Sequence, residues 1–324
     1  MNLVFTKEVI MNRYRKILVA AIIDQEKQPA LERALDLANR STKSTDITLF
    51  CTIYDFSYEM TSMLSPEERT AMRNGVVSQK VTFLNSLVSS YTLAEHITIK
   101  VKVLWHNRPY EAIINEIFDD KYDILIKATR EHAKLETVFF TPTDWHLLRK
   151  SPIPVLLVKE RSWPENGNIL ASVHVGSENP THIKLNDKMV EEAQYFAEVL
   201  NATPHLVNAY PSTPPSIHVE LPEFDSVHYK DAIRGYHLTE MKALRQRYGI
   251  PEEQTHVYEG PTEDVISEVE DELHAELVIL GTTGRTGLSA IFIGNTAENT
   301  LALLNSDILA LKPEGYISPL DPNN

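Results

Sequence analysis

The sequence has a single cysteine and no long apolar run. Cys51 is the one cysteine among 324 residues, which excludes an internal disulfide and a metal site built from several cysteines. It lies in the apolar run from Ile47 to Ile53, which predicts a buried structural thiol rather than a nucleophile. No segment approaches the roughly 18 uninterrupted apolar residues that span a bilayer, so we expect no transmembrane helix.

The N-terminus also lacks a recognisable targeting segment. Residues 1–10 contain no apolar stretch of signal-peptide length, and they carry Lys7 and Glu8. We therefore expect a cytoplasmic protein with no membrane partner. Met11 is a second candidate start, because the first strand-like run begins just after it.

An excess of basic residues is missing too. The net charge is −14, and the two halves share it unequally. Residues 1–160 carry 21 Lys and Arg against 20 Asp and Glu, whereas residues 161–324 carry 10 against 25. The acidic half repels a polyanion and the first half has no basic stripe, so we expect no nucleic-acid partner.

Motifs for catalysis and metal binding are absent as well. The twelve histidines do not cluster along the chain, and neither H-E-x-x-H nor C-x-x-C occurs. No G-x-S-x-G elbow is present. His106 and His146 lie near aromatic residues, which favours hydrogen-bonded packing roles, and Asp144 before Trp145 is a candidate helix cap. We predict no catalytic residue and no metal site.

What the chain does contain is a duplication. Residues 123–159 align without a gap on residues 276–312, at an offset of 153, and residues 16–24 resemble residues 168–176. Few residues are identical, but the apolar pattern agrees throughout. A repeat of this length indicates two homologous domains rather than a solenoid. We expect domains at residues 13–160 and 167–313, with tails at 1–12 and 314–324.

Strand-like and helix-like runs alternate in each half. Ile17 to Ile23 is an unbroken apolar run, typical of a strand buried on both faces, and Pro29 to Arg40 is amphipathic. We expect further strands at 47–54, 97–104, 123–126, 155–158, 168–175, 204–210, 254–258, 277–280 and 308–311, and further helices at 66–88 and 110–118. This alternation indicates an α/β fold with a parallel sheet covered on both faces.

A glycine-rich loop follows the strand at residues 277–280. Glycines let the backbone approach a ligand closely and turn its N–H groups inward. A helix N-terminus after the loop adds unpaired N–H donors and a partial positive charge, and Arg285 adds a fork of donors. The pattern predicts a phosphate site; the alternative is a tight turn followed by a capped helix. The residues concerned are Gly281, Thr282, Gly284, Arg285, Gly294, Asn295 and Thr296.

Three features of the chain resemble the universal stress protein family in its tandem-domain form. They are the aspartate after the first strand, the repeated β/α alternation and the G-x-x-G-x9-G-[S/T/N] loop. The resemblance runs from about Arg15 to Pro313 and includes WHNRPYEAI (105–113) and FTPTDWHLLRK (140–150). It implies a non-enzymatic, cytoplasmic stress-response protein. It also implies two Rossmann-like domains of the adenine nucleotide alpha-hydrolase type, each a five-stranded parallel sheet of order 3-2-1-4-5 with helices on both faces.

The resemblance further implies that the two domains form a pseudo-dimer within one chain. The last strands, residues 155–158 and 308–311, would then pair and cover two sheet edges. A homodimer of the whole chain stays open.

In nucleotide-binding members of the family, the Asp after the first strand lies near the base, and the glycine loop holds ribose and phosphates. Both motifs belong to one crevice, because ligands bind where strands 1 and 4 diverge. The first domain has Asp24, but Ala128, Glu131 and Thr141 replace the three glycines. The second domain keeps the glycines but has Gly176 in place of the Asp.

We therefore expect ATP or another adenine nucleotide in the second domain and none in the first. The expected contacts are Gly281, Thr282, Gly284, Arg285, Gly294, Asn295 and Thr296, with Asp24 as the base-side residue of the first domain.

Two other functions remain open. The first domain carries an aromatic and methionine-rich segment, Tyr54 to Leu64, ahead of a helix that begins at Ser65-Pro66. This segment either packs as a lid or binds a hydrophobic small molecule, as in a scaffold or carrier. A slow ATP hydrolase is the second alternative, although neither first-strand loop looks like a pyrophosphate cradle.

Overall fold

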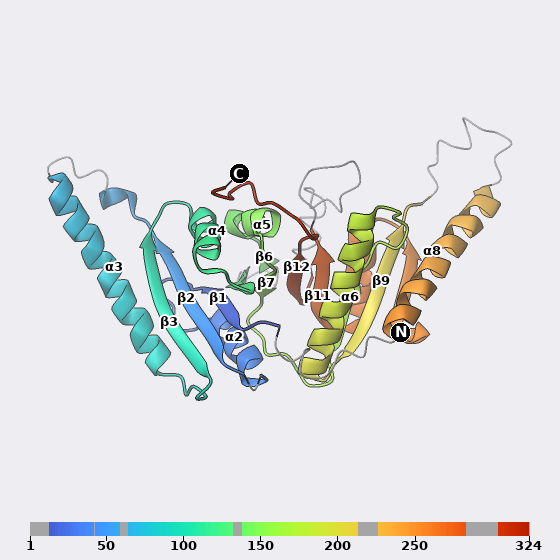
Figure 1. Ribbon diagram of the computed structural model, residues 1–324, viewed down its shortest axis with the longest axis horizontal. Helices are drawn as coiled ribbons and strands as arrows, with labels where there is room; N and C mark the ends of the chain where they lie inside the picture. The colour runs from blue at the N-terminus through green and yellow to red at the C-terminus, as the bar shows by residue number, and fades with distance from the viewer. Residues whose placement is uncertain are drawn as a thin grey trace. The chain divides into compact units, whose positions relative to one another are not determined.

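The computed structural model describes residues 13–41, 43–58, 64–131, 138–212, 226–282 and 304–323. The chain divides into two compact units. Unit 1 comprises residues 1–130, 140–162 and 317–324, and unit 2 comprises residues 131–139 and 163–316. Each unit is an α/β domain with a parallel sheet, as the sequence predicted (Figure 1).

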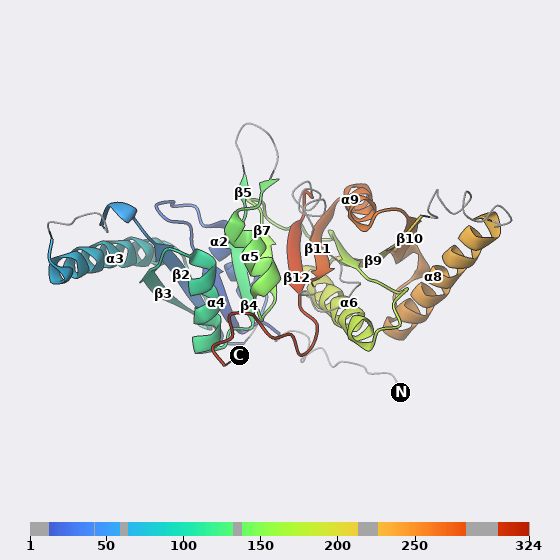
Figure 2. The ribbon, with the colours of Figure 1, turned by 90° about the horizontal axis from the view of Figure 1, so that it is seen from above.

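In unit 1 the strands lie in the order β3-β2-β1-β4-β7, which is the predicted order 3-2-1-4-5. The strands are β1 (Lys16–Ala20), β2 (Thr45–Ile53), β3 (Ile97–Trp105), β4 (Ile124–Ala128) and β7 (Val155–Val158). The helices are α2 (Pro29–Asn39), α3 (Pro66–Ser89), α4 (Pro109–Asp120) and α5 (Pro142–Lys150), with a short 3-10 turn η1 (Phe56–Tyr58). A two-stranded ribbon, β5 (Arg130–Glu131) and β6 (Val138–Phe139), precedes α5 in the chain, although Glu131 and β6 group with unit 2 (Figure 2).

The first strand is shorter than its apolar run. Ile17, Leu18 and Val19 are fully buried, as expected for a central parallel strand. The strand ends at Ala20, however, and not at the predicted Ile23. The buried side chain of Gln28 accepts a hydrogen bond from Ile22 N (2.9 Å) and donates to Ile22 O (2.8 Å). The Gln28 side chain thus satisfies the N–H and C=O groups of Ile22, which in a strand would bond to a neighbouring strand.

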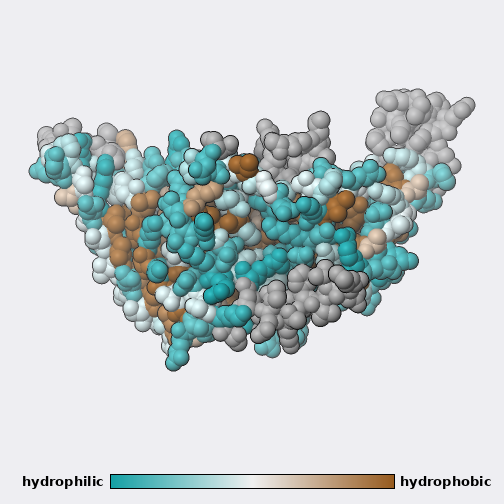
Figure 3. Space-filling view, viewed as in Figure 1, coloured by the Kyte–Doolittle hydropathy of each residue, from teal (hydrophilic) through white to brown (hydrophobic). Residues whose placement is uncertain are grey.

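Helices cover both faces of the unit 1 sheet, α2 and α3 on one and α4 and α5 on the other (Figures 1 and 2). This arrangement follows from right-handed crossovers on either side of β1. The helix α3 begins where the sequence predicted, because Ser65 forms a capping box with Glu68 and Pro66 occupies the first turn. Its Leu84 is buried, whereas Met72 is 41% exposed. Apolar surface is visible over α3 and β3 (Figure 3).

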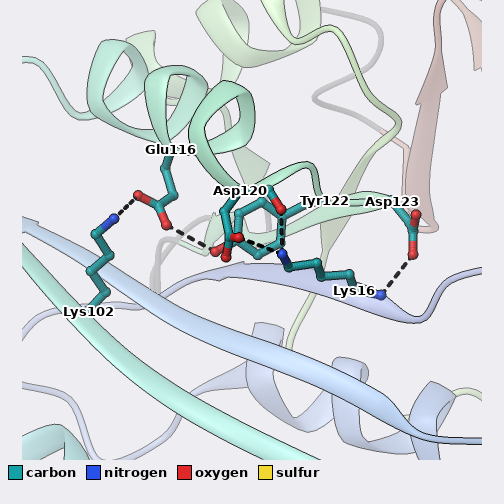
Figure 4. Close-up of polar contacts among 6 residues, drawn as sticks. All are labelled: Lys16, Lys102, Glu116, Asp120, Tyr122 and Asp123. Atoms are coloured by element: carbon teal, nitrogen blue, oxygen red, sulfur yellow. Dashed lines mark hydrogen bonds and ion pairs between the residues drawn. The ribbon is translucent and has the colours of Figure 1, made fainter.

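A polar network holds α4 and the start of β4 on unit 1 (Figure 4). Asp123 Oδ2 accepts from Lys16 N at 2.8 Å, and Lys16 Nζ pairs with Asp120 Oδ1 at 2.7 Å. Buried Glu116 accepts from Tyr122 OH at 3.0 Å and pairs with Lys102 of β3. Asp123 and Lys16 lie at the amino ends of the strands, away from the carboxyl ends where a ligand is expected, so the network is structural.

In unit 2 the strands lie in the order β10-β9-β8-β11-β12, again 3-2-1-4-5. The strands are β8 (Asn168–Ser172), β9 (Thr203–Tyr210), β10 (Thr255–Glu259), β11 (Ala275–Gly281) and β12 (Asp307–Leu311). The helices are α6 (Pro180–Leu200), α8 (Ser226–Tyr248) and α9 (Thr262–Leu273), with a 3-10 turn η2 (Glu252–Gln254). The helices α6 and α8 cover one face, and α9 lies on the other (Figure 2).

The C-terminal segment packs on unit 1. Residues 317–324 group with unit 1, and Ser318 is 1% exposed. Its hydroxyl donates to Lys150 O at 2.7 Å, which satisfies a carbonyl at the end of α5. In the part of the chain that is described, no helix is long and apolar enough to cross a membrane. The pairing of residues 155–158 with 308–311 stays a prediction.

Candidate functional site

The carboxyl ends of the first and fourth strands of each unit define where a ligand would bind. In unit 1, Ala20 of β1 lies opposite Lys127 of β4. In unit 2, Ser172 of β8 lies opposite Leu280 of β11. The loops after these strands therefore occupy equivalent places, and the two units can be compared position by position.

Three of the eight predicted ligand contacts lie among the described residues. They are Asp24, Gly281 and Thr282. Gly284, Arg285, Gly294, Asn295 and Thr296 lie outside the described residues, so their role stays a prediction.

Gly281 allows a close packing contact between β11 and α6. A Cβ at this position would lie 2.7 Å from Leu185 Cδ2 and 3.3 Å from Met189 Sδ, both on α6. The end of β11 thus approaches α6 more closely than a side chain would allow. Unit 1 has buried Ala128 at the equivalent position. The glycine of the motif at residue 281 therefore has a structural cause that does not involve a ligand.

Thr282 uses its hydroxyl inside the sheet. Its N–H and its Oγ1 both contact Leu311 O, at 2.7 and 3.1 Å, and the residue is 3% exposed. Thr129 makes the same two contacts with Val158 O in unit 1, at 2.9 and 3.2 Å. The identical Thr pair therefore joins the fourth strand to the fifth in each unit, and only other atoms of Thr282 remain for a ligand.

In unit 1, side chains cap the helix that follows the degenerate glycine motif. Thr141, which replaces the glycine equivalent to Gly294, is the N-cap of α5. Asp144 Oδ2 accepts from Thr141 N at 2.6 Å and from Thr141 Oγ1 at 2.7 Å. The sequence suggested Asp144 as the cap; instead it completes a capping box from the first turn, because Pro142 begins the helix.

Asp144 also pairs with a charged group from the sheet. Its Oδ1 lies 2.6 Å from Lys127 Nζ, and its side chain is fully buried while that of Lys127 is 16% exposed. The carboxylate sits at the N-terminus of α5, where the helix dipole favours an anion. Asp144 thus compensates the positive end of α5, and Lys127 compensates the charge of Asp144 in turn.

In unit 1, on the side where a nucleotide base is expected, a charged pair lies near the buried thiol of Cys51. Asp24 adopts a left-handed conformation (φ 57°) and pairs with Lys80 Nζ of α3 at 2.5 Å. Burial, followed by the charge of Asp24, raises the pKa of Cys51 to about 12, although Lys80 opposes the shift. The prediction of a buried structural thiol is confirmed.

Unit 2 replaces this charged pair with neutral groups. Gly176 stands at the Asp24 position, and His237 of α8 packs over it. His237 stacks on Tyr210 at 5.3 Å and contacts Asn208 Nδ2 through Nδ1 at 3.0 Å. The strand registers place Asn208 where unit 1 has Cys51.

Three histidines meet at this end of β8, although the sequence spacing did not indicate a cluster. The ring of His174 lies 5.9 Å from that of His182, whose Nδ1 lies 2.8 Å from Ser177 Oγ. Burial lowers the pKa of His174, and His182 and His237 lower it further. The one sequence signal of this cluster is that each histidine lies either at the end of a strand or in a helix that follows a strand. Among the described residues, no group of three ligating side chains could hold a metal ion.

The histidines singled out in unit 1 have packing roles, as predicted. His146 stacks on Tyr110 with ring centroids 3.9 Å apart, and burial lowers its pKa. His106 Nδ1 accepts from Arg108 N at 3.0 Å.

The aromatic segment of unit 1 is partly exposed. Trp105 lies 5.9 Å from Tyr54 and 5.5 Å from Tyr58. Tyr54 is 41% exposed and Phe56 is 61% exposed. Residues 59–63, which include Met60 and Met63, lie outside the described residues. The segment therefore has aromatic rings that pack against Trp105, and part of its apolar surface is exposed.

Comparison with known proteins finds relatives over nearly the whole chain. The model of the universal stress protein family matches residues 13–159 and 183–312. Universal stress protein E of Escherichia coli (strain K12) is 50% identical over 312 residues, which cover 96% of this chain and 98% of that protein. The universal stress protein E homolog of Haemophilus influenzae is 43% identical over 304 residues, with coverage of 93% and 98%.

Solved structures agree with the tandem architecture. A functionally unknown protein from Pseudomonas aeruginosa PAO1 is 27% identical with a TM-score of 0.67, and 95% of each chain is covered. A universal stress protein from Archaeoglobus fulgidus is 12% identical with a TM-score of 0.62, covering 93% of this chain and 99% of that one. The second likeness supports the fold alone.

Proposed function

The chain belongs to the universal stress protein family, and we propose that it is a non-enzymatic binding module of the stress response whose unit 2 holds an adenine nucleotide, with ATP as the first candidate. A cytoplasmic location and a small-molecule ligand, with no nucleic-acid or membrane partner, belong to the same proposal.

One observation carries the choice of unit 2. In unit 1 the buried pair of Asp144 and Lys127, together with the Thr141 cap, already neutralises the helix N-terminus. A phosphate would have to take Lys127 away from Asp144, and leaving that buried carboxylate without its cation costs several kcal/mol. Unit 1 is therefore a poor phosphate site even though it retains Asp24.

Unit 2 lacks the groups that would close the site in this way. The alignment that pairs residues 123–159 with 276–312 puts Leu280 at the Lys127 position and Ala297 at the Asp144 position. Gly284 and Gly294 stand in place of Glu131 and Thr141. We propose that backbone N–H groups between Gly284 and Thr296 bind ribose and phosphates, with Arg285 and Asn295 as additional donors.

Isothermal titration of the full chain with ATP tests this proposal. We expect one site per chain, and Gly284→Glu should weaken it at least about tenfold, because the new carboxylate repels phosphate and fills the loop. The matched control is Glu131→Gly, which restores a glycine in unit 1 but leaves Asp144 in place and should keep the stoichiometry at one. Two equal sites, or no binding at millimolar ATP, would contradict the proposal.

The exposed aromatic side chains Tyr54 and Phe56 favour a second candidate function, in which unit 1 carries a hydrophobic small molecule and no nucleotide is bound. Native mass spectrometry of the purified chain separates the two. A co-purified apolar ligand supports the carrier, and a nucleotide supports the first proposal.

The alternative of a slow ATP hydrolase has a direct test. Family members are generally not enzymes, and we expect turnover at background level with Mg²⁺ or Mn²⁺ present. Phosphate release that rises with protein concentration and disappears in Gly284→Glu would instead support hydrolysis in unit 2.

A further inference from the structure

The outermost strand of unit 1, β3, is long for a strand at the edge of a sheet. It has nine residues, whereas β10, the outermost strand of unit 2, has five. An edge strand exposes a row of backbone N–H and C=O groups with which another chain can pair, and proteins commonly keep such strands short. Unit 1 therefore offers a longer pairing edge than unit 2 does.

Two hydrogen bonds at the ends of β3 show which of its backbone groups face outward. Thr45 N donates to His96 O at 2.8 Å, and His106 N donates to Ile53 O at 3.0 Å. Because the parallel register between these bonds is unbroken, the even-numbered residues of β3 bond to β2. The odd-numbered residues direct their N–H and C=O groups to the outer edge, and those inside the strand are Ile99, Val101 and Val103. In the part of the chain that the structure describes, no group bonds to these outward N–H and C=O groups.

The two faces of β3 are covered by different helices. The Trp105 ring lies 5.7 Å from the guanidinium of Arg73 on α3, and Lys102 pairs with Glu116 of α4. Since side chains alternate along a strand, the odd-numbered side chains of β3 face α3 and the even-numbered ones lie on the side of α4.

The α3 side of this edge is apolar and incompletely covered. Ile99 and Val101 are only half-buried, and Leu84 is the one buried residue among the described side chains of α3. Val81 and Val88 of that helix are half-buried too. Apolar surface is accordingly visible over α3 and β3 (Figure 3). A strand added beside β3 would cover this surface with every second side chain.

The other side of the edge is basic and selects the partner. Lys100 is exposed, and the side chain of Lys102 is 48% exposed although it pairs with Glu116. A second copy of the chain, paired antiparallel around Val101, would set Lys100 opposite Lys102 of that copy, and like charges directly opposite are destabilising. A partner strand with carboxylates at alternate positions would instead set opposite charges there.

We propose that the β3 edge is a docking surface for an extended segment of a partner protein in which apolar side chains alternate with carboxylates. The main chain of this segment adds a strand to the unit 1 sheet through the free N–H and C=O groups of β3. Its apolar side chains extend the surface under α3, and its carboxylates face Lys100 and Lys102. This role is separate from nucleotide binding in unit 2.

Two peptides as long as β3 test the chemistry of the partner. One alternates valine with glutamate, and the other alternates valine with lysine. Fluorescence anisotropy of the labelled peptides with the full chain at low ionic strength should give at least about tenfold tighter binding of the glutamate peptide, weakened by added salt. Equal affinities, or no binding of the glutamate peptide at millimolar concentration, would overturn the proposal.

A proline in β3 tests the backbone contacts. Val101→Pro removes an outward N–H but no bond to β2, so the affinity for the glutamate peptide should fall at least about tenfold while circular dichroism stays unchanged. The matched control Val101→Thr keeps the N–H group and the branched side chain and should keep the affinity. A folded Val101→Pro chain that binds the peptide as the wild type does rejects strand addition.

A charge reversal gives an independent test that does not disturb the backbone. Lys100→Glu should weaken the glutamate peptide about fivefold, whereas Lys242→Glu, the same change at an exposed position of unit 2, should have no effect. Equal affinities of these two variants would overturn the selection of an acidic partner.

Amide hydrogen exchange locates the docking surface. The glutamate peptide should slow exchange at Ile99, Val101 and Val103, and protection confined to other residues would contradict the proposal. Sedimentation of the free chain tests the other occupant of this edge. A dimer that Val101→Pro dissociates would show that a second copy pairs there and would overturn the assignment to an acidic partner.

Discussion

At the scale of single residues, Asp144 and Lys127 form a buried ion pair in unit 1. The two side chains join α5 to β4 through a 2.6 Å ion pair with no exposed surface on the carboxylate. Asp144 also accepts two hydrogen bonds from Thr141. A buried carboxylate with this many donors is favourable only while all of them are present, because removing one partner leaves the other charge without compensation.

We predict that Asp144→Ala lowers the free energy of unfolding by about 3 kcal/mol, since it removes the cap partner and leaves Lys127 unpaired. Urea unfolding of the full chain, followed by circular dichroism, measures the change. Lys127→Met should also destabilise, and the double variant should lose less than the sum of the two. The control Glu95→Ala, at an exposed carboxylate, should stay within about 0.5 kcal/mol of the wild type. An Asp144→Ala variant as stable as that control would contradict this account of unit 1.

These residues also show which parts of the fold and of the candidate site can be predicted from the sequence. The loss of the glycines in unit 1 was visible at Ala128, Glu131 and Thr141, because the internal repeat aligns them with glycines. The ion pair of Lys127 and Asp144 could not be predicted, because these residues are 17 positions apart in the sequence and only the sheet and α5 bring them together. The apolar periodicity placed each strand of unit 1 to within three residues at either end. It could not show that Gln28 ends the first strand through its side chain.

At the scale of elements, a chain of hydrogen bonds crosses β8, β9 and β10. Asn168 Nδ2 donates to Leu273 O at 2.8 Å, so its Oδ1 accepts from His205 Nε2 at 3.3 Å. His205 Nδ1 then accepts from His256 Nε2 at 3.2 Å. His205 is neutral in this arrangement, because its Nε2 donates and its Nδ1 accepts. Burial, followed by the neighbouring His256, lowers the pKa of His205 from 6.5 to about 4.

This histidine chain predicts acid sensitivity in unit 2. The pKa of His205 is lower in the folded chain than in the unfolded chain, so the unfolded state binds more protons between pH 6.5 and 4. The stabilisation is complete above pH 6.5 and is lost as the pH falls towards 4, up to about 3 kcal/mol. Urea unfolding at pH 7.5 and 4.5 measures this loss.

A pair of variants isolates the contribution of His205. His205→Leu should flatten the dependence on pH, whereas His274→Asn, at an exposed position with positive φ that asparagine tolerates, should keep the wild-type dependence. If His205→Leu loses as much stability on acidification as the wild type, the histidine chain is not the cause.

At the scale of the whole molecule, two copies of one fold have diverged at the same places. The carboxyl ends of the first, second and fourth strands carry Asp24, Cys51 and Lys127 in unit 1. The equivalent residues in unit 2 are Gly176, Asn208 and Leu280. The duplication preserved the sheet order and the Thr contacts that join the fourth strand to the fifth. It altered residues near the carboxyl ends of the strands, which is consistent with the proposal that unit 2 and not unit 1 binds a nucleotide.

A crystal structure of the full chain with a non-hydrolysable ATP analogue tests the central claim most directly. The account predicts triphosphate density against residues 281–296 of unit 2, with the ion pair of Lys127 and Asp144 intact in unit 1. Triphosphate at the N-terminus of α5, with Lys127 turned from Asp144 towards the phosphates, would contradict it.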